Sequence, residues 1–215
     1  VTAVDASIRA GDEAMAVGGP DEAADHYQTA LELLSDPGAR AEVAVDIGML
    51  GSRAANALIA AGRAMRAISV LRELLDGLAD DWPVEQRGRL LIAMANAVMV
   101  DENRLDPLDF TNAALELVAD EPTPLRALLL SVHARAHAFH DNVEEAREFG
   151  AEALTLAETQ DLPRIAADVL TTLATFDGVD GVHRRVLVLA EPHVVEDVEL
   201  GLGPEVGRIG ETGRH

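Results

Sequence analysis

The chain contains no cysteine and no lysine, and it is poor in aromatic residues, with one Trp, one Tyr and four Phe among 215 residues. Without cysteine, neither disulfide bonds nor thiolate-ligated zinc sites can form. Without lysine, the phosphate-binding motif GxxxxGK[ST] cannot be built, and the motifs GxGxxG and GxSxG are absent as well. We therefore expect a protein that is not an enzyme and that needs no cofactor.

Positive charge and long apolar runs are also scarce. The sequence has 17 basic and 38 acidic residues, which gives a net charge of −21. Both nucleic acids and anionic lipids are bound mainly through cationic side chains. The longest apolar run, at 90–100, has 11 residues and is interrupted by Asn96, whereas a membrane span needs about 20. The first 16 residues lack the profile of a secretory signal, so we expect a cytoplasmic protein that binds neither nucleic acid nor membrane.

Alanine supplies much of the 48% hydrophobic content, and alanine is the strongest helix former. Four prolines, which are tolerated in a first helical turn, recur at spacings of 46, 41 and 39 residues: Pro37, Pro83, Pro124 and Pro163. A second break follows each of these prolines, at Gly62, 101–106, 141–142 and 177–178. Breaks that alternate in this way predict an all-α chain of paired helices.

The segment 21–33, DEAADHYQTALEL, carries an inward face at offsets 0, +4, +7 and +8, as a 3.6-residue helix requires. The same offsets recur at a period near 40, in the sets Ala23, Tyr27, Ala30 and Leu31; Ala67, Leu71, Leu74 and Leu75; Pro107, Thr111, Ala114 and Leu115; and Ala146, Gly150, Ala153 and Leu154. A fifth step falls on Val186, Ala190, His193 and Val194, where Pro192 interrupts the helix. Such a period is typical of helical repeats. The alternative is an alanine-rich globular bundle that matches by chance.

DEAADHYQTALEL resembles the second helix of a tetratricopeptide (TPR) repeat, and VEEAREFGAEALTLA at 143–157 is similar. The longer period also resembles the TPR-like regions of bacterial transcriptional regulators of the MalT/LuxR type. The resemblance covers about Ala6–Leu173, without the Trp of the first-helix signature. It implies an α-solenoid of about five antiparallel helix pairs in a right-handed superhelix over residues 1–191. Residues 192–215 are expected to form an irregular cap or linker.

The resemblance also implies that the first helix of each pair lines a concave groove. The groove positions carried over to this chain are Ile8, Asp12, Met15, Met49, Ser52, Asn56, Ile59, Leu91, Ala95, Val98, Leu128, Ser131, Arg135 and Phe139. The set selected for partner binding is Met49, Ser52, Asn56, Leu91, Ala95, Leu128, Ser131 and Arg135. Of these, only Asn56 and Arg135 could hold a peptide carboxylate. Plain packing between repeats is the alternative at every position.

The implied function is a non-catalytic protein or peptide interaction module, the sensor or scaffold region of a multidomain bacterial transcriptional regulator. Self-association is a further option. The alternative function is a small-molecule or signal-peptide receptor whose superhelix encloses the ligand.

Three histidines, His133, His137 and His140, follow one helical stripe at i, i+4 and i+7. A pair at i and i+4 can chelate a divalent metal, but a third ligand seven residues on lies a further turn away. We therefore predict partly solvated histidines beside the apolar face and no metal site. His133 and His137 are the candidates if a metal is bound, and a pH-sensing role stays open.

Overall fold

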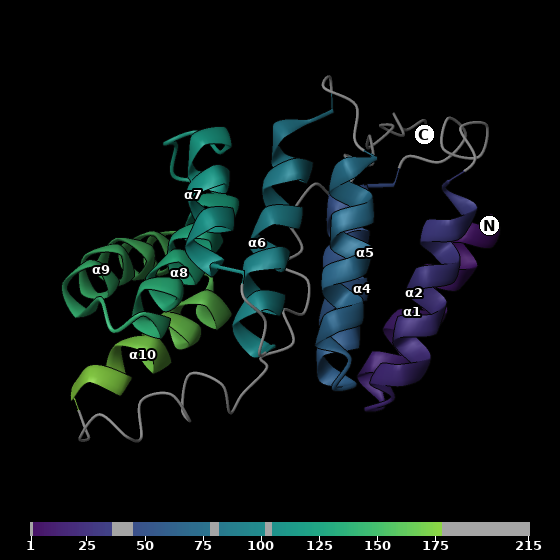
Figure 1. Ribbon diagram of the computed structural model, residues 1–215, viewed down its shortest axis with the longest axis horizontal. Coiled ribbons are helices and arrows are strands. Elements are labelled where there is room, and N and C mark those ends of the chain that lie inside the picture. The colour runs from purple at the N-terminus through teal and green to yellow at the C-terminus, as the bar shows by residue number, and fades with distance from the viewer. Residues whose placement is uncertain (1, 36–44, 78–81, 102–104, 178–215) are drawn as a thin grey trace, which may run out of the picture.

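The computed structural model describes residues 2–35, 45–77, 82–101 and 105–177. Within these ranges every regular element is an α-helix and no strand occurs (Figure 1), which confirms the all-α prediction. The helices are α1 (Ala3–Ala16), α2 (Pro20–Leu33), α4 (Ile47–Ala60), α5 (Ala64–Asp76), α6 (Val84–Val100), α7 (Pro107–Leu117), α8 (Pro124–Phe139), α9 (Val143–Thr159) and α10 (Pro163–Asp177). None of these described helices combines the length and apolarity of a membrane span.

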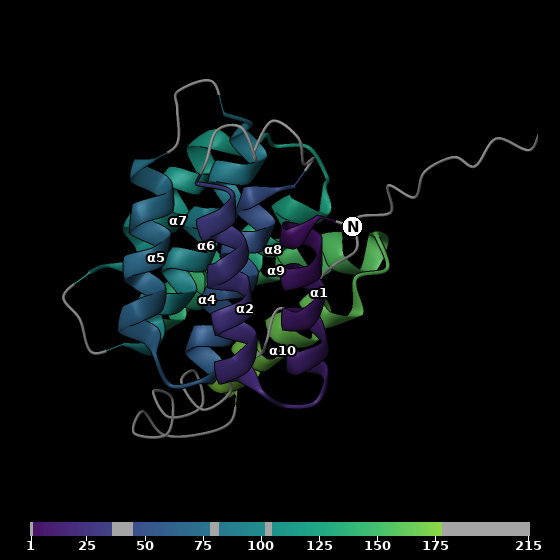
Figure 2. The same ribbon diagram turned by 90° about the vertical axis from the view of Figure 1, so that its right-hand side faces the viewer.

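Consecutive helices pack as pairs, α1 with α2, α4 with α5, α6 with α7 and α8 with α9. Each pair also contacts the next one along the chain, through α2 and α4, α5 and α6, α7 and α8, and α9 and α10. The series runs from purple α1 to green α10 across Figure 1, and Figure 2 views it from the α1 end. We call α1, α4, α6, α8 and α10 the first helices, and α2, α5, α7 and α9 the second helices.

The helix breaks predicted from proline and glycine largely match the observed helix ends. Pro124 is the first residue of α8, and the preceding Thr123 caps the helix, since its hydroxyl accepts a hydrogen bond from the backbone N–H of Arg126 at 3.1 Å. Pro83 lies one residue before α6. Gly62 has φ +72°, the left-handed conformation that glycine adopts without strain, and it separates α4 from α5. Pro37 lies outside the described residues.

The inward face predicted for the second helices is confirmed by burial. In all four helices the residues at offsets 0 and +4 are buried, and the residue at +7 is buried in every helix except α5. The leucine at offset +8 is partly buried each time. Because four helices repeat one burial pattern, the period near 40 residues describes packing as well as sequence. The fifth set, Val186, Ala190, His193 and Val194, lies outside the described residues.

Two first helices, α4 and α6, approach each other closely at Gly48 of α4. A Cβ atom added there would lie 2.6 Å from the backbone oxygen of Gln86 in α6 and 2.7 Å from its Cα. Backbone atoms cannot rotate away as the end of a side chain can, so an added methyl group would force the two helices apart. Glycine is therefore required by the α4–α6 contact.

Substitution Gly48→Ala should lower the free energy of unfolding by about 2 kcal/mol, because overpacking outweighs the helix propensity of alanine. Urea denaturation followed by circular dichroism measures this loss. Gly19→Ala is the control, since its added Cβ meets its nearest neighbour at 3.4 Å, an ordinary contact. Equal stability of the two variants would mean that α4 and α6 do not approach this closely.

Candidate functional site

Most of the side chains predicted to line a groove form an accessible surface on the first helices. We call this surface the first-helix face. Its members are all partly exposed: Ile8, Asp12, Met15, Met49, Ser52, Asn56, Leu91, Leu128, Arg135 and Phe139. It extends over α1, α4, α6 and α8, and α4, α6 and α8 contact one another in that order.

Two residues of the predicted partner-binding set do not belong to this surface. Ala95 is 0% exposed and packs in the apolar core that α6 shares with α7 and α8, and Ser131 is 2% exposed. The groove positions Ile59 and Val98 are buried in the same way. These four residues offer little surface to a partner, and their burial favours the alternative of inter-helix packing at these positions.

Arg135, predicted as a polar contact for a partner, instead joins three first helices. Its guanidinium donates a hydrogen bond to the side-chain oxygen of Asn96 in α6. Although part of the residue remains accessible, burial lowers the pKa of Arg135, and the nearby carboxylate of Asp168 in α10 opposes that shift. Asn96 was not among the residues predicted from the sequence, although it lies 40 residues after Asn56 and 39 before Arg135.

Further hydrogen bonds join the first two helix pairs at similar separations. Arg53 of α4 donates from Nη1 to both carboxylate oxygens of Asp12 in α1, at 3.2 Å and across 41 residues. The same Asp12 accepts from the hydroxyl of Tyr27 in α2 at 2.7 Å. Arg66 of α5 donates from Nε to Gln28 of α2 at 3.1 Å, across 38 residues. Asp12 of the first-helix face is therefore engaged with the neighbouring pair, and a polar contact also joins the second helices α2 and α5.

The histidines form a hydrogen-bonded chain between α7, α8 and α9. His133 is 2% exposed, and its Nδ1 lies 2.8 Å from the hydroxyl of Thr111, while its Nε2 lies 3.2 Å from Nε2 of His137. The side-chain amide of Asn142 lies 3.4 Å from the other nitrogen of His137. Protons can be assigned in one direction, from Asn142 through His137 and His133 to Thr111, whose hydroxyl reaches the carbonyl of Pro107 at 3.4 Å.

In this assignment both rings are neutral, because a proton added to Nε2 of His133 would face the N–H of His137. The pKa of His133 is lowered to about 4, mainly by burial and in part by the neighbouring His137 and Arg126. Burial likewise lowers the pKa of His137, against the attraction of Glu145 and Asp106.

The third histidine of the stripe lies apart from this pair. Nε2 of His140 lies 2.9 Å from the carboxylate of Asp106, which precedes α7. Over the part of the chain that the structure describes, no three His, Asp or Glu side chains are placed to hold a metal ion. The candidate pair His133 and His137 therefore has no third ligand of these types there.

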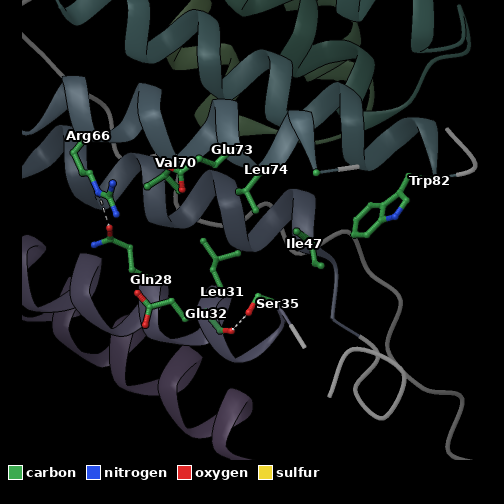
Figure 3. A pocket seen from close by; sticks show the side chains of 11 residues that line it. Gln28, Leu31, Glu32, Ser35, Ile47, Arg66, Val70, Glu73, Leu74 and Trp82 are labelled. Carbon is green, nitrogen blue, oxygen red and sulfur yellow. Dashed lines mark hydrogen bonds between the residues drawn. The ribbon is translucent and has the colours of Figure 1, made fainter. Parts of the chain in front are cut away.

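A hollow of about 270 Å³ lies between the second helices α2 and α5 (Figure 3). Leu31 of α2 and Leu74 of α5 face each other across it, and Trp82 closes one end. Glu32 and Glu73 stand at its rim. None of the lining residues belongs to the first-helix face, and the sequence analysis did not find this site.

Comparisons with known proteins add no assignment. No protein-family model, no curated protein and no solved structure matches this chain. The resemblance to TPR proteins and to MalT/LuxR-type regulators therefore stays a prediction, and function has to be argued from the geometry.

Proposed function

We propose that this chain is a non-catalytic binding module, a TPR-like α-solenoid that holds a protein or peptide on its first-helix face. The support is the pairwise packing of successive helices, the burial pattern that repeats in four second helices, and the hydrogen bonds between pairs at separations of 38 to 41 residues. Arrays of this kind present extended surfaces to their partners. The proposed setting is the sensor or scaffold region of a cytoplasmic bacterial transcriptional regulator, and it depends on the resemblance of the longer repeat period to the TPR-like regions of such regulators.

The observation that carries this proposal is the composition of the first-helix face. It combines accessible apolar side chains, such as Met49, Leu128 and Phe139, with polar side chains that are already held in place by neighbouring helices. A partner would therefore gain apolar burial against a surface that needs little further ordering.

The distribution of charge favours the same face. The four second helices carry 13 acidic residues against three basic ones, Arg66, Arg72 and Arg147. The five first helices together carry seven arginines and six acidic residues. A peptide on the first helices therefore avoids the strongly acidic second helices.

Met49→Glu should test the proposal, because it places a charge in the middle of the first-helix face. Peptides selected from a random displayed library on the unaltered chain should lose at least about tenfold in affinity for this variant, as expected when a charge must be buried unpaired. Calorimetric titration of the selected peptides measures the loss.

The matched control is Met65→Glu on α5, where the methionine is 59% exposed on a second helix. This variant carries the same change in charge and should bind the selected peptides as the unaltered chain does. If both variants lose affinity equally, or if neither does, the first-helix face is not the binding surface.

The alternative of a receptor whose superhelix encloses a small molecule has less support. The hollow that could take such a ligand lies between α2 and α5, outside the first-helix face. It is better treated as a separate site.

A further inference from the structure

The hollow between α2 and α5 pairs an apolar floor with an acidic rim (Figure 3). Leu31 from α2 lies opposite Val70 and Leu74 from α5, and the indole of Trp82 lies at one end. Covering such a floor favours a ligand with an apolar body, and an indole face also attracts cations.

The side chains at the rim favour positive charge. Glu32 on α2 and Glu73 on α5 are both exposed, and neither has an ion-pair partner among the described residues. The one cation of the lining, Arg66, already donates its Nε–H to Gln28 at 3.1 Å. The lining therefore has two carboxylates for one guanidinium.

The backbone adds to this negative potential. α2 and α5 both end beside the hollow, where Ser35 and Gly77 belong to its lining. The C-terminus of a helix carries a partial negative charge, and neither helix has a basic residue in its last turn to offset it. The opposing N–H of Ile47, at the start of α4, is already donated to the side chain of Gln86 at 3.2 Å.

We propose that this hollow binds a small organic cation, a molecule with one apolar ring or short chain and one ammonium group. The ring would cover Leu31 and Leu74 beside Trp82, and the ammonium would lie between Glu32 and Glu73. A volume of about 270 Å³ falls just below the 300–1,000 Å³ typical of ligand sites, so it suits a single ring better than a partner helix. The net charge of −21 concentrates cations at the surface.

Three probes of similar shape and different charge test the proposal: phenethylamine, the neutral 2-phenylethanol and the anionic 3-phenylpropionate. Trp82 is the only tryptophan of the chain, so its fluorescence reports binding at the hollow. Phenethylamine should bind with a millimolar dissociation constant, the alcohol should bind at least about threefold more weakly, and the anion should bind most weakly of all. The proposal is overturned if no probe binds, or if the anion binds as well as the amine.

Two double variants then test whether the carboxylates at the hollow, and not the overall charge, attract the ammonium group. The double variant with Glu32→Gln and Glu73→Gln should bind phenethylamine with about tenfold lower affinity at low ionic strength. Its affinity for the alcohol should stay unchanged. Glu148→Gln with Glu152→Gln removes the same charge from the exposed side of α9 and should change the affinity less than about twofold. Equal effects of the two pairs would show that only the overall charge matters, which would refute the site. Neither pair touches the first-helix face, so this test is independent of the proposed function.

Discussion

Replacing Arg135 with alanine should lower the free energy of unfolding by about 3 kcal/mol, because it removes a charge-assisted hydrogen bond and side-chain packing from a partly buried site. The loss has two sources. The apolar stem of Arg135 no longer packs between the first helices. The side chain of Asn96 loses its donor, and Asp168 loses the positive charge beside it. Urea denaturation at neutral pH measures the change.

Arg72→Ala is the matched control, because Arg72 is exposed on the second helix α5. It should change stability by less than about 0.5 kcal/mol. Arg135→Met keeps most of the stem and removes the charge, so its stability should fall between those of the other two variants. If Arg135→Ala is no more harmful than Arg72→Ala, then Arg135 does not hold α6, α8 and α10 together.

The sequence predicted those features that depend on neighbouring residues along the chain. The inward face of α2 follows from the helical spacing of Ala23, Tyr27 and Ala30, which are all nearly inaccessible. The start of α8 follows from the hydroxyl of Thr123, which can cap a helix wherever it lies. Such local rules hold without knowledge of how the helices pack.

The composition of the candidate site depends on packing between helices, and this was predicted less well. Ala95 and Leu91 lie one turn apart on α6, yet Ala95 is buried and Leu91 is partly exposed, because contacts with α7 and α8 decide which side is covered. The bond from Arg135 to Asn96 could have been suspected only from their spacing of 39 residues. The hollow between α2 and α5 has no signature in the sequence, since separate helices supply its walls.

The contacts of the histidines likewise depend on packing between helices and could not be predicted from the sequence. The spacing of His133 and His137 suits a metal pair as well as a hydrogen-bonded pair, so it does not distinguish between them. In the structure the two rings form a hydrogen-bonded pair, and α7 brings the hydroxyl of Thr111 within 2.8 Å of His133. Nothing in the sequence around either residue indicates that contact.

Acid should destabilise the chain through His133. In the folded state burial holds the pKa of His133 at about 4, below its ordinary value of 6.5. Between these two pH values the unfolded chain binds the proton more readily than the folded chain does. The stabilising contribution is therefore complete above about pH 6.5 and is lost as the pH falls toward 4, with a total near 3 kcal/mol.

His133→Gln removes the titrating ring and keeps side-chain groups that can hydrogen-bond to Thr111. The free energy of unfolding of this variant, measured by urea denaturation at pH values from about 4 to 7, should vary less with pH than that of the unaltered chain. His26→Gln is the control, since it removes a partly exposed histidine from α2. Taking the difference between each variant and the unaltered chain cancels the contribution of the 38 acidic residues. If the stability of His133→Gln keeps the full pH dependence, the hydrogen bonds between neutral side chains from Asn142 to Thr111 do not contribute to stability.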